Sequence, residues 1–171
     1  MVRATFVLGA LLISGCVGDQ GRYPIAGEGV PHPIIDTSGR QIGTTVTSWH
    51  PQGWHFSYDV SGLSPGSHGA HLHEAGRCDP PDFASAGAHY NPFGKQHGSE
   101  NPLGPHRGDL GDGIYVYDSG NAKYGYYFLW KAHPMPNGLS LIIHANRDDK
   151  RTDPSGNTGA RIACSVLIPP G

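Results

Sequence analysis

At 171 residues the chain has the length of one domain, and its net charge of −2 gives no support to nucleic-acid binding. Its 26 glycines and 15 prolines, with no long apolar period of 3.6 residues after the first segment, favour short strands joined by turns and long loops. The chain also has 11 histidines, and histidine is the commonest metal ligand, so their positions bear directly on function.

The N-terminal segment has the composition of a secretion signal. One arginine precedes an apolar run over residues 4–13, which is too short and too terminal for a membrane-spanning helix. The run is followed by Ser14-Gly15-Cys16, which resembles a bacterial lipobox. Residues 1–15 are therefore predicted to be a lipoprotein signal peptide. An ordinary signal peptide cleaved nearby, or a buried strand, is the alternative.

On this interpretation Cys16 becomes the lipidated first residue of the mature chain. Residues 16–25 are polar and rich in glycine and would form a flexible tether to a folded domain over 26–171. The domain would be held at the bacterial cell envelope by this lipid anchor, facing the periplasm or the exterior. Val17 is not the aspartate that retains lipoproteins in the inner membrane of enteric bacteria, which favours the outer membrane.

Within the domain, apolar runs bounded by turn residues predict a series of β-strands. The segment 54–60 alternates most clearly, with a large apolar side chain at every second position. The first run contains Pro31 and Pro33, which cannot donate to a strand ladder, so it is expected to be an edge strand at best. A hairpin turn is expected over 118–121. The predicted strands are 26–35, 42–49, 54–60, 114–117, 124–130, 139–144 and 161–168.

A long stretch between about residues 75 and 112 has little periodicity and is rich in Gly, Pro, His and Asp. A loop of that length in a compact domain is usually functional. The strands on either side of it indicate an all-β domain, either a sandwich or a barrel.

Two clusters of candidate metal ligands stand out. His71 and His73 are two residues apart and would project from the same face of a strand, where two imidazoles can chelate one ion. An exposed pair without metal is the alternative. His144 ends a predicted apolar strand and becomes a candidate because a copper ion needs more ligands than these two.

The second cluster lies within the long loop. Three imidazoles and one carboxylate complete the tetrahedral shell of a zinc site, and nitrogen and oxygen ligands without thiolate suit zinc or Cu(II). Solvated loop histidines are the alternative. The members of this cluster are His89, His97, His106 and Asp109.

The cysteines add a structural expectation. If Cys16 carries lipid, Cys78 and Cys164 remain, and two remaining cysteines in an exported chain suggest one disulfide. Two free thiols are the alternative.

Several motifs occur in one particular order along the chain: H-G-x-H-x-H, a cysteine, S-A-G-x-H-[FY]-N-P, H-G, H-x-G-D-L, a strand-end histidine and G-x-R-x-A-C. Here they occupy 68–73, Cys78, 85–92, 97–98, 106–110, His144 and 159–164. In this order the motifs resemble those of the copper/zinc superoxide dismutases, and the resemblance runs from about residue 26 to 168. It implies an eight-stranded Greek-key β-barrel, an immunoglobulin-like sandwich, with two long functional loops.

The resemblance also assigns roles by position. Copper would be held by His71, His73, His89 and His144, and zinc by His89, His97, His106 and Asp109, so that His89 bridges the two ions. Asp148 would link a copper histidine, His71, to a zinc histidine, His97. Arg161 would stand beside the open copper position, Cys78 and Cys164 would form the disulfide, and His68 would be structural.

The implied reaction is the dismutation of superoxide to dioxygen and hydrogen peroxide at copper, with zinc in a structural role. Superoxide would be the substrate, and a homodimer is left open. Arg147, Lys150 and Arg151 would form a basic rim that steers the anion, or else a solvated charged loop. The sequence departs from the family pattern at Ser165, which replaces a glycine, in the short segment between His144 and Cys164, and in the stretch 112–137.

Two other functions are consistent with parts of the sequence. A non-enzymatic copper-binding or copper-storage lipoprotein would need the copper ligands but no anion channel, and Arg161 argues against it. A β-sandwich adhesion module with incidental histidines is the other, and the complete ligand set argues against that.

Overall fold

The computed structural model describes residues 29–50, 53–123, 127–130 and 135–171. The predicted signal peptide over 1–15, the lipidated Cys16 and the predicted tether over 16–25 lie outside these residues and stay predictions. The helical structure in the described ranges is one 3-10 turn, η1 (Ala84–Ala86), and no helix there is long and apolar enough to cross a membrane.

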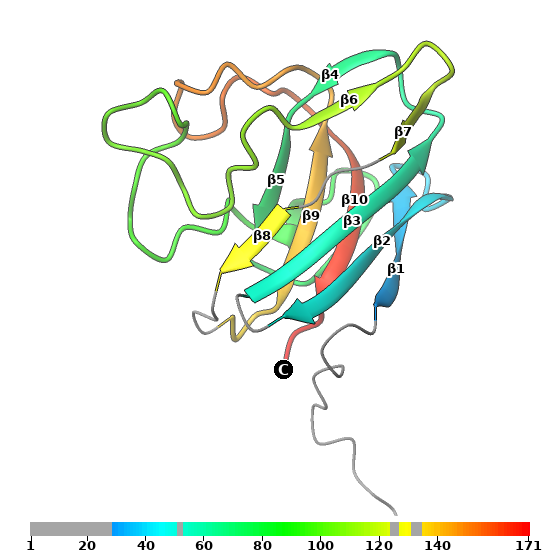
Figure 1. Ribbon diagram of the computed structural model, residues 1–171, viewed down its shortest axis with the longest axis horizontal. Helices are drawn as coiled ribbons and strands as arrows, with labels where there is room; N and C mark the ends of the chain where they lie inside the picture. Colours follow the sequence, from blue (N-terminus) through cyan, green and yellow to red (C-terminus); the bar gives the residue numbers. More distant parts are fainter. Residues whose placement is uncertain (1–28, 51–52, 124–126, 131–134) are drawn as a thin grey trace, which may run out of the picture.

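A curved antiparallel sheet of eight strands forms the body of the domain (Figure 1). Its order is β5-β9-β10-β1-β2-β3-β7, with β8 also paired to β3, while β4 and β6 form a separate two-stranded sheet. The all-β prediction is confirmed, and the closed eight-stranded Greek-key arrangement stays a prediction. The bounds are β1 Val30–Asp36, β2 Gln41–His50, β3 Gly53–Ser61, β4 Gly66–His68, β5 Ala70–His73, β6 Ile114–Val116, β7 Asn121–Lys123, β8 Tyr127–Trp130, β9 Leu139–His144 and β10 Arg161–Ile168.

The strands predicted most clearly are confirmed. In β3 the side chains of Trp54, Phe56, Tyr58 and Val60 are buried and that of Asp59 is exposed, as the alternation requires. Strand β9 is buried along its whole length because it lies between two apolar clusters. Its odd-numbered residues join the main core, and Ile142 packs with Phe83 on the other side.

The prediction that the first strand lies at an edge is wrong. Strand β1 lies between β10 and β2 in the sheet. However, β10 pairs with β1 only at Ile35 and Asp36, whereas Pro31 and Pro33 pair with β2 alone. The prolines therefore stand where β1 has a single neighbour, which is the environment of an edge strand, where proline is tolerated.

The predicted turn over 118–121 is present, and Tyr117 donates its N–H across it to the carbonyl of Asn121 at 3.0 Å, but the strands on either side do not form a hairpin. Gly120, with a φ of +76°, donates its N–H to the carbonyl of Tyr117 at 2.8 Å. The strands that this turn joins belong to different sheets, because β6 pairs with β4 and β7 pairs with β3. The turn thus carries the chain from one sheet to the other, and the following strand begins at Asn121 instead of residue 124.

Two loops carry the candidate ligands that lie outside the strands. The first runs over 74–113, as predicted, and the second over 145–160. Both gather at the end of the sheet where β9 finishes, away from the C-terminus (Figure 1). This end of the molecule contains the candidate site.

Candidate metal centre

Strand β5 positions the first two histidines. Ala70 and Leu72 point into the main core, so His71 and His73 share the opposite face, as predicted. Both imidazoles are buried, with 0% and 1% of their surface exposed, which excludes the alternative of an exposed pair.

The long loop passes directly along this face. Leu72 donates its N–H to Gly108 and accepts from Tyr90, at 2.9 and 2.8 Å. A Cβ atom on Gly108 would lie 2.3 Å from the carbonyl oxygen of Leu72, so this approach requires glycine. The contact brings His89 opposite His73, and Asp109 opposite His71.

Four buried ring nitrogens converge between β5, the end of β9 and the long loop, and they form the first set of candidate ligand atoms. They are Nδ1 of His71 and Nε2 of His73, His89 and His144, and none has a hydrogen-bond partner among the described residues. The ligand atoms of these four histidines lie within 4.8 Å of one another. Buried polar atoms are almost always satisfied, so four orphaned lone-pair positions at one point fit a cation with nitrogen ligands.

The opposite nitrogens of three of these rings are held in place. Nδ1 of His73 lies 2.9 Å from the carbonyl oxygen of Gly87, and Nδ1 of His144 lies 3.2 Å from that of Gly159. A carbonyl can only accept, so each of these nitrogens carries the proton and leaves Nε2 with a free lone pair. Nε2 of His71 is likewise 2.6 Å from Asp148.

A second set of ligand atoms surrounds Asp109. Its Oδ1 atom lies 3.0 Å from Nδ1 of His89, 3.0 Å from Nδ1 of His97 and 3.3 Å from Nδ1 of His106. The Nδ1 atoms of His89 and His106 are 3.3 Å apart. Ligands about 2.0–2.1 Å from a tetrahedral zinc ion are separated by about 3.3 Å, so these four residues fit zinc.

Proximity also groups His71 with His89, His97 and Asp109. However, Nε2 of His71 is bonded to Asp148, and its Nδ1 belongs to the first set. His106 instead presents a nitrogen directly to Asp109, so it completes the second set. The structure thus brings together the residues that the sequence singled out, with Nδ1 of His89 at the second set and Nε2 at the first, and the assignment of copper and zinc to them stays a prediction.

Asp148 joins the two sets from behind. Its Oδ2 atom accepts from Nε2 of His71 at 2.6 Å, and its Oδ1 atom lies 3.0 Å from Nε2 of His97. Lys150 also donates its N–H to Oδ1, at 2.6 Å. The predicted link between His71 and His97 is therefore present, in a carboxylate that is itself buried.

The electrostatics favour neutral imidazoles in the first set. Burial, assisted by neighbouring histidines, lowers the pKa of His73 to about 2, of His89 to about 4 and of His144 to about 3. These imidazoles are therefore uncharged at neutral pH, with one ring nitrogen free to bind a metal ion.

His97 behaves in the opposite way. Burial disfavours its charge, but its hydrogen bonds to Asp109 and Asp148 prevail and raise its pKa to about 9. Burial opposes the ionisation of both acids, yet hydrogen bonds with histidines hold the pKa of each well below its usual range: those of His89 and His97 at Asp109, and those of His71 and His97 at Asp148. The two carboxylates thus attract positive charge to this point, and a bound cation would supply it.

Arg161 begins β10 directly opposite His144. Its Nη1 atom donates to the carbonyl of Phe83 and its Nη2 atom to that of Gly87, both at 2.7 Å. Gly87 is also the acceptor for His73, so one carbonyl fixes both the guanidinium and a ligand of the first set. Arg161 thus lies beside this set, where the resemblance placed it.

The disulfide Cys78–Cys164 is present, with Cα atoms 5.7 Å apart, and it excludes the alternative of two free thiols. It ties the start of the long loop to β10, close to Arg161.

His68 is buried and its two ring nitrogens lie 2.8 Å from the carbonyl oxygens of His144 and Ser64. It therefore has no nitrogen left for a metal, in agreement with the structural role expected.

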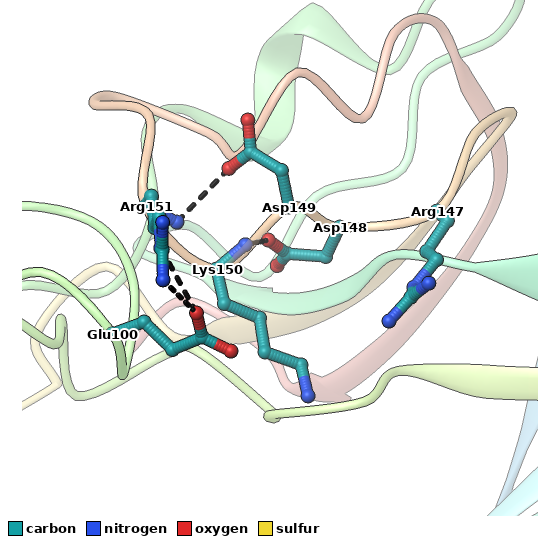
Figure 2. Close-up of a pocket in the computed structure, with 6 residues that line it drawn as sticks. All are labelled: Glu100, Arg147, Asp148, Asp149, Lys150 and Arg151. Atoms are coloured by element: carbon teal, nitrogen blue, oxygen red, sulfur yellow. Dashed lines mark hydrogen bonds and ion pairs between the residues drawn. The ribbon is translucent and has the colours of Figure 1, made fainter.

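The charged residues of the second loop line an open pocket of about 460 Å³ (Figure 2). Arg151 donates to Glu100 at 2.8 Å, and Lys150 is paired with Asp112. Arg147 has no ion pair within the described ranges of the chain. Two of the three proposed steering residues therefore connect the two loops, and the arrangement favours a paired charged loop over a basic rim.

The comparisons with known proteins agree with this geometry. A family profile described as copper/zinc superoxide dismutase matches residues 42–167. A Cu-Zn superoxide dismutase of Aquifex aeolicus is 40% identical over 143 residues, which cover 78% of this chain and 84% of that protein. The Cu-Zn superoxide dismutase of Caulobacter vibrioides is 38% identical over 139 residues, which cover 75% and 79%.

Two solved structures are similar throughout the domain. A superoxide dismutase-like protein from Bacillus subtilis aligns with a TM-score of 0.73 at 34% identity, covering 80% of this chain and 97% of that one. The Cu/Zn superoxide dismutase of Brucella abortus aligns with a TM-score of 0.66 at 30% identity, covering 82% and 99%. The chain therefore belongs to the copper/zinc superoxide dismutase family.

Proposed function

We propose that this protein converts superoxide to dioxygen and hydrogen peroxide outside the cytoplasm. The two sets of ligand atoms that meet at His89 carry the proposal. Copper would be held by His71, His73, His89 and His144, and zinc by His89, His97, His106 and Asp109. Bound copper supplies one-electron redox chemistry, which zinc cannot supply.

The reaction consumes two superoxide anions and two protons and gives one dioxygen and one hydrogen peroxide, so one anion is oxidised and the other reduced. His89 is placed to handle a proton. Its Nε2 atom is buried and has no hydrogen-bond partner among the described residues, so its one lone pair could hold either the copper ion or a proton without the loss of a hydrogen bond. Its Nδ1 atom stays beside Asp109, which keeps the ring in place.

Arg161 is the group that attracts the substrate. The chain is net negative and superoxide is an anion, so a local positive charge must guide it. Two carbonyl groups hold the guanidinium beside His73 and His144, and one of them also holds His73. The charge is therefore fixed before substrate arrives, and no reorganisation is needed when the anion binds.

The extracytoplasmic location rests on two observations. The apolar run over 4–13 ends in Ser14-Gly15-Cys16, which resembles a lipobox. The disulfide Cys78–Cys164 is of a kind that persists mainly in oxidising compartments. Cys16 then carries the lipid, residues 16–25 form the tether, and the enzyme is anchored at the cell envelope.

A pulse of superoxide tests the reaction directly. Protein loaded with copper and zinc should accelerate the decay of superoxide catalytically, whereas metal-free protein should not. Arg161→Glu, with its metal content checked, should lower the second-order rate constant at least tenfold, because it reverses the charge beside the copper ligands. If superoxide decays no faster with fully loaded protein than with metal-free protein, the alternative of a copper-storage lipoprotein is favoured.

A further inference from the structure

A second carboxylate from the 145–160 loop reaches the zinc-side histidines. Oδ1 of Asp153 accepts the main-chain N–H of His97 at 2.6 Å and lies 3.7 Å from Nε2 of His106. The resemblance assigns Asp153 no role, and nothing in its local sequence marks it. The side chain of His106 is only 7% exposed, and that of Asp153 is 46% exposed, so the pair sits at the rim of the buried centre.

The chemistry of a metal-bound imidazole gives this contact a direction. His106 presents Nδ1 to Asp109 and His89, so a zinc ion there takes the Nδ1 lone pair. The ring proton must then reside on Nε2, which is the nitrogen that faces Asp153. A carboxylate behind a metal-bound histidine orients its ring and strengthens it as a ligand.

Asp153 lies behind His106 in the same way as Asp148 lies behind His97. His97 presents Nδ1 to Asp109 and has Asp148 at its Nε2 atom. His106 also presents Nδ1 to Asp109 and has Asp153 on its Nε2 side. Asp148 and Asp153 both belong to the 145–160 loop, so this one loop contacts His97 and His106 on the side away from Asp109.

We propose that Asp153 is a positioning residue of the zinc site, which orients His106 through Nε2 and fixes the main chain at His97. The proposal rests on the zinc assignment of the proposed function. It does not depend on catalysis, because it concerns the affinity for zinc alone. At 3.7 Å the contact is longer than a hydrogen bond, so Asp153 acts on the Nε2–H group of His106 by the electrostatic attraction of its charge, which its partial exposure weakens.

Two variants separate the two contacts. Asp153→Asn keeps an oxygen that can accept from His97 but removes the charge that faces His106. Asp153→Ala removes both. Asp118→Asn, in the exposed turn between β6 and β7, removes the same charge far from the site and is the matched control.

Zinc affinity is measured on the copper- and zinc-loaded protein by competition with a chelator, with copper content followed in parallel. We expect Asp153→Asn to weaken zinc binding about tenfold and Asp153→Ala more, within the 10–100-fold range usual for such partners. Asp118→Asn should leave the affinity unchanged. Far-ultraviolet circular dichroism verifies that each variant is folded.

The imidazole N–H resonances of zinc-loaded protein labelled at histidine provide a second readout. In Asp153→Asn the Nε2–H signal of His106 should shift, whereas that of His97, held by Asp148, should stay. Wild-type zinc affinity with an unshifted His106 signal in Asp153→Asn overturns the inference, even if the protein is a dismutase. Conversely, zinc loss in this variant upholds it, even if the loaded protein lacks dismutase activity.

Discussion

Gly156 shows how closely the residues around the metal centre are packed. A Cβ atom at this position would lie 2.1 Å from Oδ1 of Asp148 and 2.6 Å from Nε2 of His97. These are the two atoms of the hydrogen bond that links the second loop to the zinc-side ligands. The main chain of Gly156 also bonds to Asp149 and Thr152, so it cannot move away easily. The absence of a side chain here keeps Asp148 in reach of both histidines.

Gly156→Ala should therefore separate Asp148 from His97 and weaken the retention of both metals. Its φ of +65° adds about 1–2 kcal/mol of backbone strain for any L side chain. Gly94→Ala is the matched control, because Gly94 has a φ of +61° but nothing within 4 Å of its added Cβ. Metal content after dialysis against a chelator should fall in Gly156→Ala and stay high in Gly94→Ala. Equal retention in the two variants would show that the clash is harmless.

The ligands could be predicted from sequence, whereas the residues that support them could not. His71, His89 and Asp109 belong to motifs with a fixed spacing, and a shared metal explains why such residue types recur together. Asp153 and Gly156 lie in a short loop, and both reach His97, which is 56 positions from Asp153 in the chain. No local pattern records such tertiary contacts, so only the structure identifies these two.

At the level of elements, regular strands were predictable and their pairing was not. Alternation located β3, which packs one face against the core, and apolar runs located β9 and β10. Strands β4 and β5 have three and four residues, too few for a period to emerge. The errors at β1 and at the 118–121 turn concern which strand neighbours which, and that is decided by contacts distant in the sequence.

The disulfide joins the long loop to the last strand. It closes a separation of 86 residues, which in the chain-entropy model corresponds to about 4–5 kcal/mol. It also holds the loop segment whose carbonyls at Phe83 and Gly87 fix Arg161.

The double variant Cys78→Ser/Cys164→Ser should therefore lower the free energy of unfolding of the metal-free protein by about 4–5 kcal/mol in a urea titration. Cys16→Ser, which removes a thiol outside the disulfide, is the control and should leave the midpoint unchanged. A double variant with the wild-type midpoint would mean that the loop is held by its other contacts alone.

At the scale of the whole molecule, the strand directions place the metal centre far from the N-terminal end of the domain. Strand β1 is antiparallel to β10, and β10 is antiparallel to β9, so β1 and β9 run the same way. Val30 begins β1 and His144 ends β9, so the two lie at opposite ends of the sheet (Figure 1). A chain anchored ahead of β1 would present the metal centre away from the membrane.

The loss of the lipid anchor should leave the metal centre unaffected. Cys16→Ser should remove the lipid attachment and move the protein from the membrane to the soluble fraction of exported material. Its dismutase activity per bound copper should equal that of the anchored form, because the attachment point and the ligands are at opposite ends of the sheet. Fractionation followed by metal and activity assays measures both quantities. A variant that stays wholly with membranes would place the anchor elsewhere in the chain, whereas a released but inactive variant would show that the metal centre depends on the anchored end.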